Sequence, residues 1–292
     1  MSLTLVGAGP VGVTLAALLV RRGHRAVSVI SRSRRSAHRA ARLLGSPVAS
    51  DDLHDISAKT SLVIVAVPEE ELADLARRAS ALEHLPWRGV CVFHTSGAQT
   101  SELLKPLSDR GAMAFALHPI QSFPRGRRLH EQLSLMEGVA YAFQGPPRFA
   151  PLARRIVRDL DGTMVVVPKQ RKILYHAACV FASNYPVVLL DIVEDLAKAV
   201  SPDLGLEAFR PLTESSIAHA AALSPTAALT GPVVRTSVRT VKGHRQALAA
   251  HSHEIAEIYR VLALHALRMA IRRGDVRGAG AKRLRSILRK RT

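Results

Sequence analysis

The feature that most constrains the fold is a closely spaced glycine run near the N-terminus, Gly7-Ala8-Gly9-Pro10-Val11-Gly12. A short apolar strand precedes this run, and a mostly apolar helix follows it and ends at Gly23. In such a G-x-G-x-x-G turn the first glycine permits a tight turn, the second lets backbone approach a pyrophosphate, and the third allows close helix-on-strand packing. The free N–H groups of the helix then point at the phosphates. The pattern predicts a dinucleotide site at 7–12; the alternative is a structural turn without a nucleotide.

Residues about 20 positions beyond the glycines distinguish NAD from NADP. Here Ser31-Arg32-Ser33-Arg34-Arg35 follows the second predicted strand, Ala26 to Ile30, and contains no acid. A carboxylate accepts hydrogen bonds from the ribose 2′-OH of NAD, whereas hydroxyl and guanidinium donors suit the 2′-phosphate of NADP. We therefore expect NADP(H) rather than NAD(H), bound through Ser31, Arg32, Ser33 and Arg34. The alternative is a solvated basic loop.

The composition is that of a globular protein, with 48% hydrophobic and 22% charged residues in a chain of 292. No uninterrupted apolar run reaches the roughly 18 residues of a membrane span, and the N-terminus lacks a charged region and a cleavage site. We therefore expect a cytoplasmic protein without a membrane segment. Cys91 and Cys179 lie far apart in apolar segments and match no metal or disulfide spacing, so no metal site is expected.

The net charge of +18 raises the question of nucleic acid. Residues 268–292 contain ten Lys or Arg and one Asp. Such a run is usually a solvated tail, although non-specific phosphate binding obeys the same electrostatics. An aromatic content of 4% argues against base stacking. We expect a basic C-terminal tail over 276–292, and nucleic-acid contact at most through this tail.

Alternation of strands and helices predicts an α/β fold with a doubly wound parallel sheet at the N-terminus. The expected strands after the second one are 61–67, 89–93, 112–117, 138–144 and 164–167. From Pro168 onward only helices are expected, over 169–199, 204–223, 238–250 and 252–273, with Pro186 kinking or splitting the first. The predicted domains are a nucleotide-binding domain over 1–167, an all-helical domain over 168–275 and the tail.

Ligands of such sheets bind at the carboxyl ends of the strands. That rule brings four segments toward one crevice: 7–12, Val67-Pro68, His94-Thr95-Ser96-Gly97, and His118 to Phe123. We expect Val67, Pro68, Thr95 and Ser96 to contact the cofactor. The alternative for Thr95 and Ser96 is to cap the next helix.

The long helix after Pro168 carries a polar stripe, since Lys172, His176, Cys179 and Ser183 fall within about 60° of one another at 100° per residue. Tyr175 and Asn184 flank the stripe. Buried polar groups need partners, so the stripe faces a wet cleft, a ligand or another helix; His176 alone could be a satisfied core histidine. Arg235, in a turn between helices, is either a carboxylate or phosphate clamp or a plain surface arginine.

Several motifs together resemble a known family. They are Gly7 to Gly12, Ala66-Val67-Pro68, Phe93 to Gly97, Leu117-His118-Pro119 with Phe123, Tyr175-His176-Ala177-Ala178 with Ser183-Asn184, and Ala228 to Pro232 with Arg235. The chain resembles Rossmann-like oxidoreductases with a helical C-terminal domain of unknown function, relatives of pyrroline-5-carboxylate reductase, prephenate dehydrogenase and the 6-phosphogluconate and β-hydroxyacid dehydrogenases.

The resemblance implies an NAD(P)-dependent reductase with an N-terminal Rossmann domain and a 6-phosphogluconate-dehydrogenase-like helical domain that commonly forms a homodimer. Two positions depart from the pattern. The family usually continues Gly-Asp after the arginine, where this chain has Thr236-Ser237. The β-hydroxyacid relatives use a lysine four residues before the helix asparagine, and that position is Val180 here.

The sequence thus predicts hydride transfer between NADP(H) and a small carbonyl or imine. The accepting atom gains negative charge and needs a proton donor, for which His176 is the first candidate and His118 the second. Ser96, Ser183 and Asn184 would orient the substrate, and Lys172, Tyr175 and Arg235 would contact it. The alternatives are a non-catalytic NADP(H)-binding sensor or scaffold and, less favoured, a basic nucleic-acid-associated protein.

Overall fold

The computed structural model describes residues 1–124 and 126–290. The chain forms two compact units, Met1–Tyr185 and Pro186–Thr292, which divide at Pro186 inside helix α7 (Lys172–Val200). The sequence places the domain boundary near Pro168, where the strands end. The compact unit extends beyond that point because the first turns of α7 contact loops of the sheet domain, as described below.

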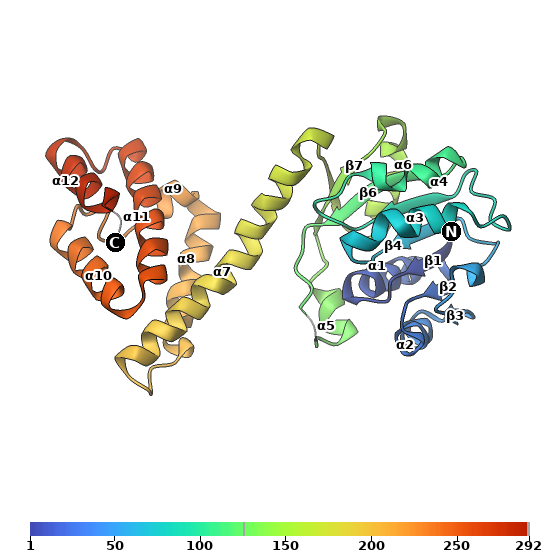
Figure 1. The fold of residues 1–292 in the computed structure, drawn as a ribbon, viewed down its shortest axis with the longest axis horizontal. Coiled ribbons are helices and arrows are strands. Elements are labelled where there is room, and N and C mark those ends of the chain that lie inside the picture. The colour runs from blue at the N-terminus through green and yellow to red at the C-terminus, as the bar shows by residue number, and fades with distance from the viewer. Residues whose placement is uncertain (125, 291–292) are drawn as a thin grey trace. The chain divides into compact units, whose positions relative to one another are not determined.

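The N-terminal unit is built on one sheet, which contains eight strands among the described residues, in the order β3-β2-β1-β4-β5-β6-β7-β8 (Figure 1). The strands are β1 (Ser2–Val6), β2 (Arg25–Ile30), β3 (Ala49–Ser50), β4 (Leu62–Val65), β5 (Cys91–His94), β6 (Met113–Pro119), β7 (Ala140–Gln144) and β8 (Thr163–Val166). Strands β1 to β6 are parallel, as expected.

The doubly wound, mainly parallel sheet expected from the sequence is present. The last two strands run against the other strands, a direction that the sequence does not specify. β7 pairs antiparallel with β6, and β8 pairs parallel with β7. An antiparallel neighbour needs no crossover helix, and the described part of the β6–β7 connection contains only the short helix α5 (Leu129–Ser134).

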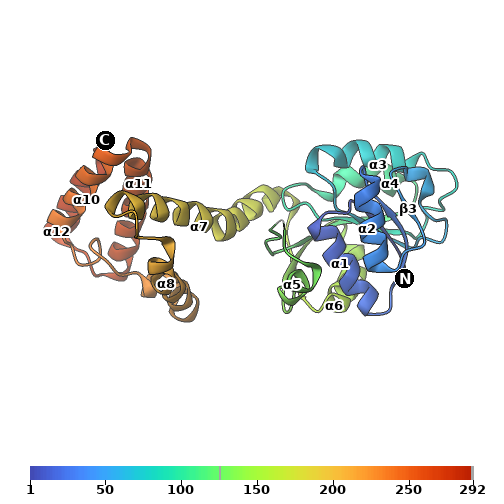
Figure 2. The same ribbon diagram turned by 90° about the horizontal axis from the view of Figure 1, so that it is seen from below.

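Helices cover both faces of the sheet (Figure 2). One face packs against α1 (Pro10–Arg21), α2 (Arg34–Leu44), α5 and α6 (Ala150–Asp159). The other packs against α3 (Leu72–Ser80) and α4 (Lys105–Asp109). The chain changes faces between β1 and β4, so the switch point where ligands bind lies at the carboxyl ends of these strands.

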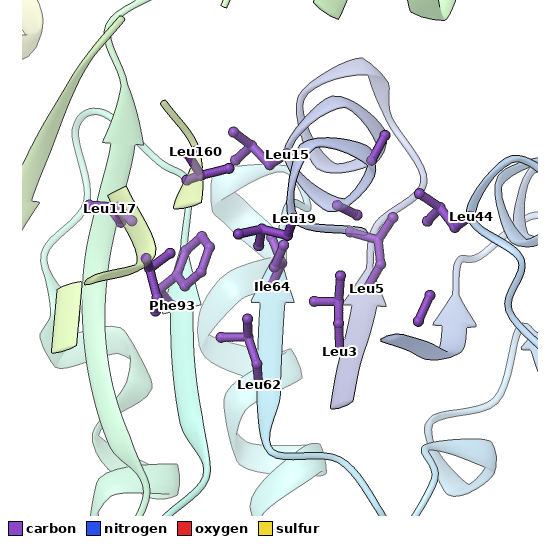
Figure 3. Packing of buried hydrophobic residues seen from close by; sticks show 14 of the residues in the cluster. Leu3, Leu5, Leu15, Leu19, Leu44, Leu62, Ile64, Phe93, Leu117 and Leu160 are labelled. Carbon is purple, nitrogen blue, oxygen red and sulfur yellow. The ribbon is translucent and has the colours of Figure 1, made fainter. Parts of the chain in front are cut away.

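The burial of β4 on both faces explains why all of its residues, Leu62–Val65, are apolar. Leu62 and Ile64 pack with the α1 side chains Leu15 and Leu19 on one face (Figure 3), whereas Val63 and Val65 belong to the cluster on the other. A strand that alternates between two apolar layers has no polar face.

The C-terminal unit is helical. Its elements after α7 are α8 (Arg210–Leu223), α9 (Pro225–Ala228), α10 (Val238–His251), α11 (His253–Arg273) and α12 (Gly278–Arg289). Ser252 begins α11 by accepting a hydrogen bond from the Ile255 N–H at 3.3 Å, and Gly274 ends it in the left-handed conformation. Its apolar core gathers residues of α10, α11 and α12.

The segment 276–292, expected as a basic tail, instead contains helix α12 over Gly278–Arg289. Leu284 and Leu288 are fully buried with α11 residues. Two leucines four residues apart share one helix face, and this apolar stripe holds the segment in place despite its charge. Residues 291–292 of the expected tail lie outside the described structure.

Thr236, which stands where the resembling family has glycine, adopts a left-handed backbone with φ of 54°. Its side chain lies against α12: a Cβ added to Gly280 would come within 2.6 Å of the Thr236 Cγ2. A β-branched residue is unfavourable in this conformation, and the missing side chain at position 280 makes room for it.

Among the described residues, one helix, Lys169–Val200, is long and apolar enough by length and composition to cross a membrane. Polar residues such as His176, Asn184 and Asp191 interrupt its apolar sequence, which is why no uninterrupted apolar run of this length occurs in the chain. This helix is α7 with the turn before it, and it includes the polar stripe described above.

Candidate functional site

The glycine turn has the geometry that each of its glycines predicts. Gly7 has φ of 100°, and a Cβ there would lie 2.2 Å from the Ala66 carbonyl oxygen. A Cβ on Gly12 would lie 2.5 Å from the Gly7 oxygen and 2.8 Å from Leu5 Cδ1. Gly9 has nothing within 4 Å of such an atom. Gly7 and Gly12 are thus required by packing, whereas Gly9 leaves open space in front of the backbone.

A cavity of about 520 Å³ opens beside this turn. Its walls come from the turn, the end of β2, and the segment after β4; the sequence-predicted residues among them are Gly7, Ala8, Gly9, Ser31, Arg32, Val67 and Pro68. Helix α1 begins next to it at Pro10 with no side-chain cap, so its first N–H groups are available to an anion. The residues present fit a dinucleotide.

Two acids that sequence reasoning missed hold the arginines at the end of β2. Arg32 pairs with Glu71 at 2.5 Å, and Arg34 pairs with Asp51 at 2.8 Å. The hydrogen bond from Arg34 lowers the pKa of the Asp51 carboxyl. Asp51 and Glu71 also line the cavity. Ser33, by contrast, caps α2 by accepting from the Ser36 N–H at 3.3 Å.

His94, at the end of β5, is buried and fixes the following loop. Its Nδ1 accepts the Ser96 N–H at 3.2 Å, so its Nε2 carries the proton and donates to the Thr100 carbonyl at 3.1 Å. Burial, opposed by that hydrogen bond, lowers the pKa of His94 to about 4. Both ring nitrogens are satisfied in the neutral form, which makes His94 a structural residue.

Ser96 is occupied within its own loop. Its hydroxyl donates to the Glu69 carboxylate and accepts the Gln99 N–H at 3.0 Å, and Gln99 Nε2 donates to Glu69 at 3.3 Å. Burial raises the pKa of Glu69, but the hydrogen bonds from Ser96 and Gln99 outweigh it and leave the pKa lowered. The capping alternative does not hold for Ser96, because the next helix, Ser101–Leu104, begins after Thr100 without a side-chain cap and Ser96 instead stabilises the loop before it. Thr95 is half-buried beside it.

Two histidines meet at Gly97. A Cβ on this glycine would lie 2.5 Å from His176 Cδ2 and 2.9 Å from His118 Nε2. The two rings are perpendicular, with centroids 6.2 Å apart. His118 Nδ1 is 2.6 Å from the Tyr175 hydroxyl, and burial together with the charge of Lys172 lowers the pKa of His118 to about 4. The structure thus brings His118 next to Tyr175 and His176, which follow it by 57 and 58 residues in the sequence.

Lys172 is only 1% exposed. Its Nζ donates to the Ser96 carbonyl at 3.3 Å and lies 5.6 Å from the centre of the Tyr175 ring. Burial lowers the pKa of Lys172 to about 8. No carboxylate of the described residues lies within ion-pair distance of Nζ, and the negative charge of Glu69 stabilises the ammonium from further away.

The remaining predicted residues lie apart from this cluster. Ser183 is half-buried and Asn184 exposed, two to three turns further along α7. Arg235 belongs to the helical unit, where it is exposed and lines a cavity of about 460 Å³ with Thr230, Gly231 and Arg273. Arg273 is held by Asp275 and by the Ala227 carbonyl at 2.9 Å.

The lowered pKa values of His94 and His118 predict that the folded protein loses stability in acid. The pKa of His94 is about 4 in the folded chain and 6.5 in the unfolded chain. As the pH is lowered, the unfolded chain therefore binds the proton first. Stability is therefore complete above pH 6.5 and falls as pH drops from 6.5 to 4, by about 3 kcal/mol for His94. We expect His94→Gln to flatten this part of a urea-unfolding pH profile, whereas His38→Gln, an exposed histidine of α2, leaves it unchanged. A wild-type stability that is constant between these pH values would contradict the assignment.

Comparisons with known proteins agree with this architecture. Residues 1–119 match the Rossmann-like domain family, and residues 139–266 match a domain of unknown function, DUF2520. No curated protein matches the sequence significantly.

Solved structures share the fold at low identity. BF3122 of Bacteroides fragilis, provisionally described as an NADP oxidoreductase, has a TM-score of 0.74 at 21% identity over 91% of this chain and 98% of that one. TM1727 of Thermotoga maritima has a TM-score of 0.71 at 23% identity, covering 93% and 99%. An imine reductase of Myxococcus stipitatus, solved with NADP+, has a TM-score of 0.56 at 17% identity, covering 99% and 100%.

Proposed function

Because the chain joins a Rossmann-like domain to a C-terminal DUF2520 domain, we propose that it is an NADP(H)-dependent oxidoreductase acting on a small carbonyl or imine. The observation that carries the proposal is the placement of two features in one unit. The dinucleotide-sized cavity lies at the carboxyl end of β1, and the His118, Tyr175, His176 and Lys172 cluster lies at the ends of β5 and β6.

The nicotinamide ring would supply or accept the hydride, and the protein must then manage a proton. His176 is half-buried beside Gly97 and is proposed to give that proton to the reduced oxygen or nitrogen. Tyr175 fixes the ring of His118, so that a neutral His118 donates a hydrogen bond through Nε2. The buried Lys172 charge favours negative charge developing nearby.

Ser183 and Asn184 follow on the same helix and are proposed to orient the substrate, while Ser96 and Thr95 shape the floor of the site. Arg235 and its cavity in the helical unit are proposed to bind an anionic group of the substrate, because Arg235 offers a planar pair of donors and no acid lines that cavity among the described residues.

The NADP(H) preference is proposed to come from Arg32 and Arg34, whose guanidinium groups are oriented by Glu71 and Asp51. We expect the double variant Arg32→Ala/Arg34→Ala to bind NADPH at least about tenfold more weakly, since hydrogen bonds to a charged group contribute about 1.5–3 kcal/mol. NADH affinity should change little. Titration of both cofactors, with Arg42→Ala of α2 as control, tests this; an equal loss of both cofactors would contradict it.

A homodimer is proposed from the apolar side chains that α7 and α8 expose. Val187 and Leu212 are 67% and 66% exposed, and Phe181, Val188 and Ile217 are also exposed. Large exposed apolar patches mark interaction sites. We expect light scattering to give twice the chain mass of 31.6 kDa, and Val187→Glu/Leu212→Glu to give the monomer mass. Leu43→Glu on α2 is the control, and a wild-type monomer would contradict the proposal.

The test of the activity is NADPH oxidation across a panel of small keto acids, aldehydes and cyclic imines. Turnover of one class, with weaker turnover from NADH, is the expected result. Tight NADPH binding without turnover of any panel member would instead favour the non-catalytic sensor. A cytoplasmic location accords with this function, since the cofactor pool and reduced cysteines belong to that compartment.

A further inference from the structure

The hydride-transfer site makes no use of the strongly basic surface formed by α10, α11 and α12. Residues 238–290 contain thirteen Lys and Arg against three Asp and Glu, a net charge of +10 out of +18 for the chain. The three helices lie side by side in both views (Figures 1 and 2). More than half of the excess charge is therefore concentrated in one small helical body.

Helix α12 presents its cations outward. Leu284 and Leu288 are fully buried, whereas the basic side chains between and around them are exposed: Lys282, Arg283, Arg285, Arg289 and Lys290. The cations thus occupy the outer face of a helix whose inner face belongs to the core, which gives them fixed spacing along an ordered element.

The end of α12 is fastened by arginines from the other two helices. Arg245 of α10 donates to the Ile287 carbonyl and, at 2.8 Å, to the Lys290 carbonyl, and Arg260 of α11 donates to the Leu288 carbonyl at 3.3 Å. These bonds satisfy carbonyls that a helix end leaves open. The basic side chains of α12 are therefore carried by a helix that is bonded to both neighbouring helices, and not by a solvated tail.

Basic grooves flank α12 on both sides. One cavity of about 400 Å³ is lined by Arg268, Arg285 and Arg289 with two leucines. The other, of about 360 Å³, is lined by Lys242, Arg245 and Lys290 with uncharged residues. No acid lines either groove among the described residues, and two nearby acids, Glu257 and Asp275, are paired with Arg260 and Arg273.

We propose that this face of α10, α11 and α12 binds the phosphate backbone of duplex nucleic acid without reading its sequence. Guanidinium groups bind phosphate oxygens through paired hydrogen bonds. Base stacking has no platform here, since Tyr259 is the one aromatic residue of 238–290 and is half-buried against His244. Insertion into a membrane is disfavoured because the apolar side chains of α12 lie in the core.

Nine of the thirteen Lys and Arg residues of 238–290 lie beyond the DUF2520 match, which ends at residue 266. Most of the positive charge is therefore separate from the proposed hydride-transfer site, and the surface is expected to bind independently of NADPH. Deleting α12 would remove Leu284 and Leu288 from the core, so charge substitutions are the appropriate test.

The experiment measures binding of the full-length chain to a random-sequence duplex of about 30 base pairs by fluorescence anisotropy between about 50 and 200 mM KCl. The variant Lys282→Gln/Arg283→Gln/Arg285→Gln/Arg289→Gln should flatten the slope of log K against log salt by about 3.6, because each lost contact contributes about 0.9. The control removes four exposed arginines of the Rossmann unit, Arg42, Arg154, Arg155 and Arg158, and should keep the wild-type slope.

A second variant, Lys242→Gln/Arg268→Gln on α10 and α11, should flatten the slope by about 1.8, so the result does not depend on α12 alone. Circular dichroism and NADPH titration establish that each variant is folded. The proposal is overturned if the wild-type chain does not bind the duplex at low salt, if the control loses as much as the α12 variant, or if phosphatidylserine vesicles are bound and the duplex is not.

Discussion

Replacing His176 by Asn is expected to lower kcat by about 10²- to 10⁴-fold, the contribution typical of a positioned general acid. Asn fills a similar space next to Gly97 but cannot deliver a proton. The affinity for NADPH should stay near the wild-type value, because the dinucleotide cavity lies at the ends of β1, β2 and β4. Steady-state kinetics with the substrate found in the panel, together with an NADPH titration, measures both quantities.

His118→Asn provides the comparison. If His118 orients the substrate through Nε2, its replacement should raise KM as well as lower kcat, whereas His176→Asn should lower kcat with little effect on KM. An unchanged kcat in His176→Asn would remove His176 from the proposed mechanism and make His118 the remaining donor.

Gly7→Ala is expected to lower the free energy of unfolding by about 3 kcal/mol or more. The new methyl group would lie 2.2 Å from the Ala66 carbonyl oxygen on a backbone with φ of 100°. Left-handed strain contributes about 1–2 kcal/mol, and forcing an atom into a packed site adds about 1–3 kcal/mol. Chemical denaturation measures this loss.

Gly9→Ala, two residues away, should give the opposite pattern. Nothing lies within 4 Å of a Cβ at this position, and its φ of −78° suits any residue. The fold should keep its stability, while the methyl group occupies the space through which the backbone approaches a pyrophosphate. NADPH affinity should fall at least about tenfold, or about 1.4 kcal/mol. Unaltered affinity in this variant would argue against cofactor binding at the glycine turn.

Much of the fold follows from local sequence signals. Three elements are each predicted by a few neighbouring residues, and all three are present. They are the glycine turn, the strand within 61–67 and the helix within 252–273. The direction of β7 and β8 has no such local signal. The residues of a strand have the same pattern in a parallel and in an antiparallel sheet, and the two cases differ only in the segment that connects the strands.

The candidate site was less predictable, because its partners come from separate strand ends. Strand-end position identified His118 and helical periodicity identified Lys172, Tyr175 and His176. Neither signal could find Glu69, which engages Ser96, or Asp51 and Glu71, which hold the arginines. These acids belong to no linear motif, and each acquires its role only when the sheet brings neighbouring loops together.

The basic C-terminus shows how composition can mislead. Ten cations in a short stretch suggest a solvated tail, yet Leu284 and Leu288 are enough to hold α12 against α11. Amphipathic periodicity in that stretch would have been the better guide, since two leucines four residues apart define an inner face even among arginines.

The contact between Thr236 and Gly280 makes the two positions epistatic. A side chain at 280 would collide with the threonine, so the residue tolerated in α12 depends on the residue chosen in the loop more than forty positions earlier. Replacing Thr236 by Gly would remove the Cγ2 atom that a side chain at 280 meets and would open position 280 to substitution.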